Sequence, residues 1–516
     1  MKRIPITFVA ICLVLKFISA LGFCSETNIS AADYLAMQPK PNFKPGYHLP
    51  KLTRWGGTMS FEARVELARN WGYALEYGGY ANLNDVKTKL QNTNSIESRV
   101  CALAASEPRQ FQLAVLLDRN FPKPVPDEFW VRDQQGRFTD GKNTWEDSSD
   151  AKFHKVVSPE SPDEYWQKVA ESFTKPLKLI HQQASIAIVL NGGEYGVGVP
   201  RWDSAAWASD PHVLAARGNR SWFEYASERK AHYEQIIAKT IREALPDREL
   251  YIYYKTSSES RRRTGEEHWK ESAYDSAVIG NISDLPNFEC YYQHGNTGWT
   301  GDNDMLTRFL DSVGYNQGLG APLNYNWVCG GWTRGGKNDF SDIPHYMGFL
   351  KCLYTAGMIG GTAGYFTYPK GGFAVPFPAD NPPQWLLQMI ALSRVHALFS
   401  HIEPFLQQGY LLPGPLRHQW SKDQPAYEFP TGDPGIRVMA RKLRTGPHWL
   451  VTIWATVGED RQVEVEIPEL GRLSLIARAS GAVYHVTTSG GKITATLLDK
   501  DGVLPTGDLP IIELNQ

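Results

Sequence analysis

Short apolar segments of strand length alternate with longer segments of helical periodicity over residues 47–406. The eight predicted strands are residues 48–55, 73–77, 111–117, 184–190, 249–255, 287–293, 323–328 and 364–368. The clearest predicted helices are residues 60–70, 161–183, 222–245 and 383–406. This alternation is typical of βα units around a parallel sheet. Eight such units favour a (β/α)8 TIM barrel over an open doubly wound sheet, because no Gly-rich phosphate turn follows the first strand.

The pattern changes from about residue 411 onward. Apolar and polar residues alternate there in short segments separated by Gly, Pro and Asp turns, at residues 437–443, 449–455, 462–467, 473–479, 483–487 and 492–498. A period of two predicts strands that bury one face, and a series of them predicts an antiparallel β-sandwich. The sequence therefore predicts an α/β barrel over residues 47–410 and a β-sandwich domain over residues 411–516.

The first 22 residues have the layout of a secretory signal peptide, with Lys2 and Arg3 before an apolar stretch and small residues near its end. Lys16 interrupts that stretch, which argues against a membrane anchor. We expect a signal peptide at 1–22 and a Pro-punctuated, extended arm at 23–46. The expected location is secreted or periplasmic, without stable membrane insertion.

Composition narrows the class of protein. The 53 Lys and Arg residues nearly balance the 55 Asp and Glu residues, which argues against nucleic-acid binding. The cysteines outside the N-terminal segment are too sparse for a disulfide scaffold and are expected as buried thiols, with a single bridge as the alternative: Cys101, Cys290, Cys329 and Cys352. Aromatic residues make up 12% of the chain, an excess that both core packing and carbohydrate stacking predict.

Polar and aromatic side chains gather at the ends of the predicted strands. In a TIM barrel, active-site residues come from the C-terminal ends of the strands. A mixture of acids, amides, bases and aromatic rings suits a polyhydroxylated ring. The candidate substrate-binding residues are Trp55, Glu76, Asn191, Tyr254, Lys255, Tyr291, His294, Asn326, Trp327 and Trp332.

Glu194 is the foremost catalytic candidate. It follows a buried strand and the tight turn Asn191-Gly192-Gly193. A carboxylic acid beside apolar walls can protonate a leaving oxygen. Capping of the following helix, or pairing with an Arg at a strand end, is the structural alternative.

A glycoside hydrolase needs a second carboxylate, about 5–5.5 Å away for retention of configuration and further for inversion. Glu289 is the candidate, because it shares a strand face with Tyr291. A salt bridge between Glu289 and Lys255 is the structural alternative. The reserve acids are Glu76, Asp118, Asp302 and Asp304.

The segment with Asn191 and Glu194 resembles that of the large retaining clan of TIM-barrel glycoside hydrolases. In that clan an Asn and the acid/base Glu end strand four, and a nucleophilic Glu ends strand seven. Two glycines separate the pair here, where the clan has Asn directly before Glu, and Glu289 lies on the predicted sixth strand. The resemblance implies an exported hydrolase of O-glycosyl bonds with a carbohydrate substrate, and identifies no family within the clan.

The resulting mechanistic hypothesis assigns three roles. Glu194 protonates the glycosidic oxygen, and Glu289 attacks the sugar or activates water. The side chains of Asn191, Tyr291 and Asn326 hold the ring. Cationic residues also gather at the predicted strand ends and would suit sulfate or uronate groups, with ion pairing to nearby acids as the alternative: Arg54, Arg119, Lys255, Arg334 and Lys370.

Two other functions remain open on the sequence. A non-catalytic glycan-binding protein would keep the aromatic residues without needing two facing acids. A polysaccharide lyase would use a base and a neutralising cation, for which Tyr254, Lys255 and His294 are candidates. A metal-dependent barrel hydrolase would need several His residues at strand ends, where His294 is the one candidate, so no metal and no cofactor is expected.

Overall fold

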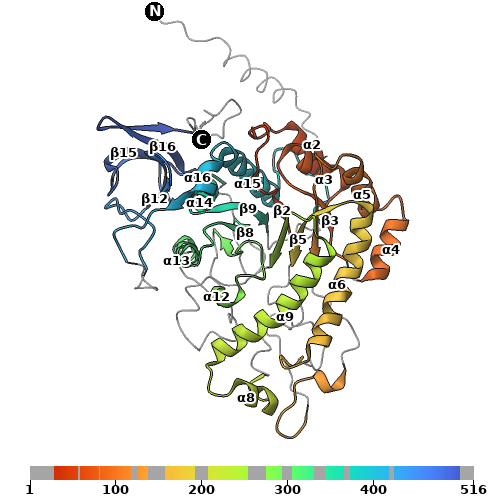
Figure 1. Cartoon of the computed structure of the whole chain (residues 1–516). Coiled ribbons are helices and arrows are strands. Elements are labelled where there is room, and N and C mark those ends of the chain that lie inside the picture. Colours follow the sequence, from red (N-terminus) through yellow and green to blue (C-terminus); the bar gives the residue numbers. More distant parts are fainter. Residues whose placement is uncertain are drawn as a thin grey trace, which may run out of the picture.

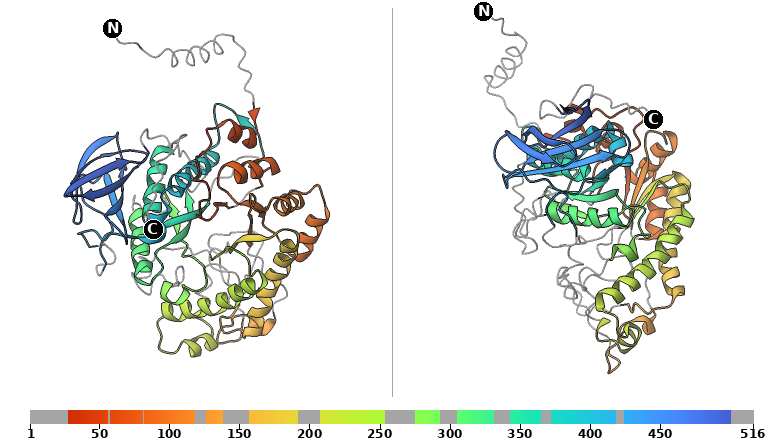
Figure 2. Two further views of the ribbon diagram at one scale, coloured as in Figure 1. Left: turned by 45° about the horizontal axis from the view of Figure 1, so that its top comes forward. Right: turned by 60° about the vertical axis from the view of Figure 1, so that its left-hand side comes forward.

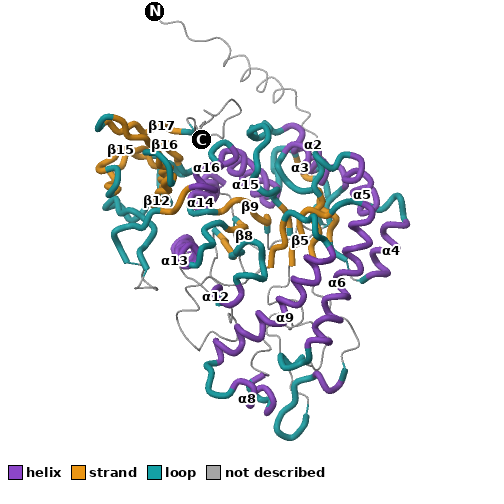
Figure 3. The backbone as a smooth tube through the Cα atoms, viewed as in Figure 1, coloured by secondary structure: helices purple, strands orange, loops and turns teal. Residues whose placement is uncertain are grey.

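The computed structural model describes residues 28–55, 58–80, 82–117, 126–137, 157–191, 207–253, 275–292, 305–330, 343–364, 372–417 and 424–499. Two four-stranded parallel sheets lie at its centre, and helices surround them (Figures 1 and 3). The first sheet has the order β3 (Leu75–Gly78), β4 (Leu113–Leu117), β5 (Ile186–Asn191) and β6 (Leu250–Tyr253). The second has the order β2 (Thr53–Arg54), β9 (Met358–Ala363), β8 (Asn324–Cys329) and β7 (Glu289–Tyr291). The expected mixed α/β class with parallel strands is confirmed.

Hydrogen bonds connect the two sheets at both pairs of edges. Leu52, just before β2, forms a parallel bridge with Tyr73, just before β3. At the other edges, the backbone N–H of Asp284 donates to the carbonyl oxygen of Tyr251 on β6 at 2.9 Å, so the segment that leads into β7 lies beside β6. Strands that follow each other in sequence are therefore also neighbours in space.

Side chains on the first sheet alternate between two apolar environments. Ile188, Leu190 and Ile252 pack together with Tyr325 of the second sheet, so they lie between the two sheets, on what we call the inner face. Val189 and Tyr251 point the other way and pack with the helices, on the outer face. Because both faces are buried, these strands are apolar along their whole length, as is usual in parallel sheets.

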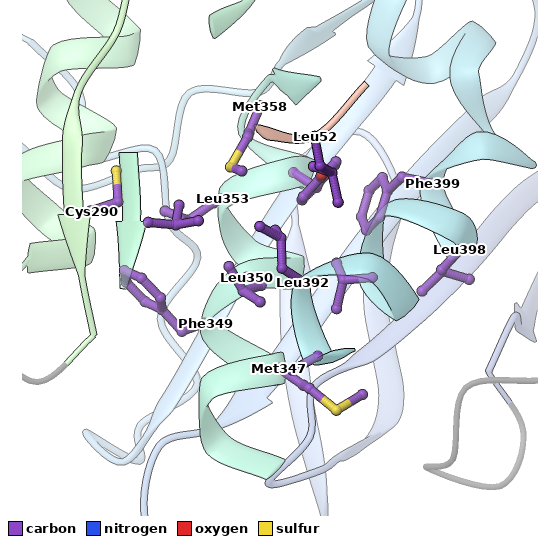
Figure 4. Packing of buried hydrophobic residues seen from close by; sticks show 14 of the residues in the cluster. Leu52, Cys290, Met347, Phe349, Leu350, Leu353, Met358, Leu392, Leu398 and Phe399 are labelled. Carbon is purple, nitrogen blue, oxygen red and sulfur yellow. The ribbon is translucent and has the colours of Figure 1, made fainter. Parts of the chain in front are cut away.

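The helices cover the outer faces. They are α3 (Phe61–Asn70), α4 (Leu83–Gln91), α5 (Ile96–Ser106), α6 (Asp163–Gln183), α8 (Pro211–Arg217), α9 (Trp222–Ala244), α12 (Ser276–Ile279), α13 (Met305–Gly318), α14 (Ile343–Thr355), α15 (Gln384–Ser400) and α16 (Glu403–Gln408), with a 3-10 turn η1 at Asp127–Phe129. Ser60 caps α3, where its hydroxyl accepts from the N–H of Ala63 at 3.2 Å. Ser221 and Glu224 form a reciprocal capping box on α9. Figure 4 shows the apolar side chains of α14 and α15, including Leu350, Leu353 and Leu392, that pack under the second sheet.

Three sequence expectations differ from the structure. The strand β9, Met358–Ala363, lies in a segment that was not expected to be a strand, while residues 365–368 of the expected eighth strand lie outside the described residues. Gly360 and Gly361 of β9 approach the side chain of Tyr325 and the backbone of Asn326 more closely than a side chain permits. The helix expected at 383–406 is two helices, and the second begins at Glu403, with Pro404 in its first turn. The segment 23–46, expected to be extended, contains β1 (Asn28–Ile29), paired with β10 (Phe377–Pro378), and the helix α2 (Ala31–Met37).

The C-terminal region is an antiparallel sheet domain (Figure 2). Its five-stranded sheet has the order β11 (Gly409–Leu411), β12 (Ile436–Leu443), β13 (His448–Ala455), β16 (Ala482–Ser489) and β17 (Lys492–Leu497). The hairpin β14 (Arg461–Ile467) and β15 (Gly471–Ala477) packs its buried face against that sheet, with Val465 and Leu475 in one cluster with Val438 and Val451.

Buried contacts attach this domain to the helices. Lys351 of α14 forms an ion pair with Asp499 and donates to the carbonyl oxygen of Gly481 at 2.7 Å. The side chains of Lys351 and Asp499 are 0% and 1% exposed. Trp454 of β13 packs beside Tyr292 and Phe349, within the same apolar cluster as α14 and α15. The domain therefore shares its core with the α/β region.

Among the described residues, no helix is long and apolar enough to cross a membrane. The signal segment expected at 1–22 lies outside the described residues. Cys101, Cys290, Cys329 and Cys352 are buried free thiols, as expected.

Candidate active site

Five of the predicted site residues lie on the inner face of a strand or directly after a strand. Glu76 belongs to β3, Tyr291 to β7 and Trp327 to β8, and Trp55 directly follows β2. Glu289 shares the strand face of Tyr291. Other predicted residues lie outside the described residues: Glu194, Tyr254, Lys255, His294 and Trp332, together with the cations Arg119, Arg334 and Lys370.

A hydrogen bond joins the two inner residues of β7. The hydroxyl of Tyr291 donates to Oε1 of Glu289 at 3.0 Å. Glu289 is half-buried, whereas Cys290 between them is completely buried on the outer face. Burial, and then the negative charge of Glu289, raise the pKa of the Cys290 thiol well above its ordinary value. The thiol therefore stays protonated, and Glu289 is the ionisable group that β7 offers to the inner face.

Aromatic rings lie directly beside this carboxylate. Trp55 and Trp327 meet edge to face, with ring centroids 4.8 Å apart and an interplanar angle of 70°. Tyr291 and Cys329 complete the cluster. Trp327 is buried and Trp55 is half-buried, so Trp55 is the ring that retains an accessible surface. A Cβ at Gly364 would overlap the indole Nε1 of Trp327, which explains why glycine follows β9.

An ion pair lies across β2 and β3. The guanidinium of Arg54 binds the carboxylate of Glu76 and lies 5.8 Å from the ring of Phe373. Arg54 is only 4% exposed. Arg64 supports the same strand, because its guanidinium donates to the carbonyl oxygens of Glu76 and Tyr77 at 2.8 and 3.2 Å. The charge of Arg54 is therefore balanced within the protein, as the ion-pairing alternative expected.

The two asparagines expected to hold substrate face away from the inner side. Asn191 is completely buried, and its amide donates to the Tyr251 hydroxyl at 3.0 Å and approaches Glu234 of α9 at 3.5 Å. Asn326 is also completely buried, and its amide donates to Oδ1 of Asn324 at 2.6 Å. Its Oδ1 accepts from the backbone N–H of Phe288, directly before β7, at 3.2 Å. Both side chains therefore connect structural elements.

Polar groups that sequence reasoning missed lie behind these strands. Glu234 is completely buried on α9 beside Lys230, and burial lowers the pKa of Lys230 from 10.5 to about 8 against the opposing effect of the Glu234 charge. Gln388 of α15 accepts from the backbone N–H of Gly330, at the end of β8, at 2.9 Å. Nothing in the sequence separates these side chains from ordinary polar positions on helices. Among the described residues, no group of three His, Cys, Asp or Glu side chains could hold a metal ion.

No protein-family model matches the chain, and no curated protein sequence matches it. Solved structures with similar folds include glycoside hydrolases. An exo-carrageenase of family GH42 from Bacteroides ovatus is 10% identical in sequence and has a TM-score of 0.50. The matched region covers 87% of this chain and 84% of the exo-carrageenase.

Two further similar structures are an α-galactosidase of family GH36 from Geobacillus stearothermophilus and an α-amylase from Geobacillus thermoleovorans. The first is 11% identical, covers 90% of this chain and 58% of its own, and has a TM-score of 0.44. The second is 11% identical, covers 86% of this chain and 95% of its own, and has a TM-score of 0.41. At 10% identity, the exo-carrageenase match describes a shared fold and leaves the activity of this chain to its own residues.

Proposed function

We propose that the protein is a glycoside hydrolase in which Glu289 is one of two catalytic carboxylates. The observation that carries the proposal is the Tyr291–Glu289 hydrogen bond beside the Trp55 and Trp327 rings, at the C-terminal ends of β7 and β8. A fixed carboxylate next to an aromatic surface is what cleavage of a bound sugar requires, because the ring stacks on the indole while the carboxylate reaches its anomeric carbon.

The proposal includes a closed (β/α)8 barrel. Hydrogen bonds at both pairs of sheet edges, and the shared inner core of Ile188, Leu190 and Tyr325, support closure. The GH42 exo-carrageenase, with its TM-score of 0.50, supports the same architecture. In such a barrel the C-terminal ends of all strands form one mouth, which brings the loop after β5 toward β7.

In the proposed mechanism, Glu194 protonates the glycosidic oxygen as the bond breaks. Glu289 either attacks the anomeric carbon or removes a proton from water, depending on the separation of the two carboxyl groups. The Tyr291 hydroxyl fixes the Glu289 carboxylate by its 3.0 Å bond. Trp55 supplies the stacking surface, and the buried Trp327 fixes the orientation of Trp55.

The proposed substrate is a poly- or oligosaccharide, and the proposed setting is outside the cytoplasm, given the expected signal peptide. Sulfated polysaccharides should be included among the substrates that are tested, because the GH42 protein with a similar fold is an exo-carrageenase. Arg54 gives no support to an anionic substrate, since it is bound to Glu76. Tyr254, Lys255, His294 and Trp332 remain proposed substrate contacts on the strength of their positions after predicted strands.

The deciding experiment compares two Gln variants on a panel of neutral and sulfated polysaccharides. Glu194→Gln and Glu289→Gln should each lower turnover of an unactivated polysaccharide by about a thousandfold or more, the scale expected when a catalytic acid or nucleophile is lost. Polysaccharide binding should be retained. Glu171→Gln, an exposed position on α6, is the matched control and should keep full activity.

Full activity in Glu194→Gln or Glu289→Gln would reject the catalytic assignment of that residue. If the wild-type protein binds a polysaccharide but never releases reducing ends, it is a glycan-binding protein. Release of an unsaturated product that absorbs in the ultraviolet would instead establish a lyase.

A further inference from the structure

A cavity of about 570 Å³ lies at the N-terminal ends of α6 and α8. The helix α8 lies at the bottom of Figure 1. Three segments that are distant in sequence form it, at residues 128–136, 158–162 and 210–212. We call it the distal groove. Cavities of roughly 300–1,000 Å³ are typical of small-molecule sites. The distal groove therefore has the size of a ligand site, and it is separate from the strand ends described above.

Hydrogen bonds fix the walls of the distal groove. Asp210 is 3% exposed, and its carboxylate accepts from the backbone N–H groups of Arg132 at 3.1 Å and His212 at 2.7 Å. The backbone N–H of Ser158 donates to the carbonyl oxygen of Phe129 at 2.7 Å. Each of the three segments is thus tied to another, so the shape of the groove is preformed.

Two half-buried aromatic side chains, Phe129 and Trp130, line the distal groove. The ring of Phe129 packs against Tyr165 of α6 at 5.0 Å, which holds it in place. Half-buried aromatic rings with polar side chains around them are suited to the C–H-rich faces of sugars. The groove therefore offers the same kind of surface as Trp55, on a different part of the molecule.

The charges of the lining are close to balanced. Asp133 pairs with Arg137 at 2.7 Å and Glu160 pairs with Arg229 at 3.2 Å. The guanidinium of Arg132 donates to the carbonyl oxygens of Asp127 and Gly136, at 3.4 and 2.9 Å, within its own segment. Glu128 is exposed at the edge of the groove, where its carboxylate can accept hydrogen bonds from the hydroxyl groups of a neutral sugar.

The distal groove lies on the same side as the proposed active site. α6 begins beside Pro162 of the groove and ends two residues before β5 begins. A helix of 21 residues is about 31 Å long, and a strand of 6 residues about 20 Å. Since α6 runs back along β5, the groove lies roughly 10 Å beyond the C-terminal end of that strand.

We propose that the distal groove is a carbohydrate-binding subsite for an uncharged stretch of a polymeric substrate. The proposal deepens the glycoside hydrolase function proposed above, and it rests on that function where it identifies the bound glycan as the substrate. Binding of a neutral glycan in the groove stands on its own. Phe129 and Trp130 stack on sugar rings, and Glu128 binds hydroxyl groups.

The test is affinity electrophoresis of the full chain in gels that contain soluble xylan, galactomannan, mixed-linkage β-glucan or a sulfated galactan. We expect at least one neutral polymer to retard the protein. Trp130→Ala and the double variant Glu128→Ala with Gln134→Ala should each weaken that retardation at least threefold. The double variant changes two exposed side chains and decides the matter if Trp130→Ala fails to fold. Phe61→Ala, a half-buried aromatic position on α3, is the matched control and should bind like the wild type.

The proposal is overturned if no neutral polymer retards the protein, if only the sulfated galactan does, or if the double variant binds like the wild type. These results are independent of catalysis. An active Glu194→Gln variant would reject the catalytic assignment and leave the groove untouched, whereas wild-type binding by the groove variants would reject the groove alone.

Discussion

The hydroxyl of Tyr291 donates to Oε1 of Glu289 across 3.0 Å, from two residues further along the same face of β7. The spacing follows from the period of a strand, in which residues i and i+2 share a face. The carboxylate is therefore held in part by a residue of its own strand.

Tyr291→Phe tests this orientation. The variant keeps the ring in the aromatic cluster and removes the donor. A hydrogen bond to a charged group contributes about 1.5–3 kcal/mol, so kcat on a polysaccharide should fall about ten- to a hundredfold. Thermal unfolding should change little, because Glu289 is only half-buried. An unchanged kcat would mean that the bond has no part in the reaction.

Asn191→Ala distinguishes a structural role from a substrate contact. The variant removes a donor from the Tyr251 hydroxyl in a completely buried layer, so the free energy of unfolding should fall by about 1–3 kcal/mol. KM should stay near the wild-type value. Urea unfolding and steady-state kinetics measure both, with the exposed Asn84→Ala on α4 as control. A raised KM with unchanged stability would restore Asn191 as a sugar ligand.

Gly364→Ala tests the packing of Trp327. The added Cβ would overlap the indole Nε1, and overpacking of this kind costs about 1–3 kcal/mol. Displacement of Trp327 should also move Trp55, so affinity for a polysaccharide should fall and tryptophan fluorescence should change. Gly318→Ala on α13, where the Cβ meets no atom within 4 Å, should leave both properties unchanged.

His396 of α15 should make the fold sensitive to acid. Complete burial, and then the charge of Lys51, lower the pKa of His396 from 6.5 to about 3. The unfolded chain binds a proton below pH 6.5 and the folded chain does not, so stability falls as the pH falls through this window. The loss is about 1.4 kcal/mol per pH unit.

His396→Asn should reduce that slope, since Asn can still contact the Tyr354 hydroxyl that now lies 2.8 Å from Nδ1. Urea unfolding at about pH 7 and about pH 5 measures it. Equal slopes in the variant and the wild type would show that other groups dominate the acid response.

The sequence predicts the strands of this protein best where apolar runs are continuous. Residues 184–190 and 323–328 read as strands and closely match β5 and β8. The strand Met358–Ala363 was not predicted, because it contains two glycines that look like a turn. Only the neighbouring Tyr325 explains why glycine is needed there.

The face on which a side chain lies is harder to predict. Both faces of β5 are buried, so no alternation of polar and apolar residues marks the inner side, and Asn191 appeared to point at substrate. β7 is different, since Glu289 and Tyr291 flank a buried cysteine. There the pattern of a strand with one polar face was visible in the sequence, and the pairing of these two residues was predictable.

The Lys351–Asp499 pair has a consequence for how this protein can be divided. Removing the C-terminal domain would remove both partners of the Lys351 ammonium group, Asp499 and the carbonyl oxygen of Gly481. It would also expose to water the apolar face of α14 that Trp454 now covers. The two regions should therefore melt in one calorimetric transition. A chain truncated near residue 410 should aggregate instead of behaving as an independent catalytic module.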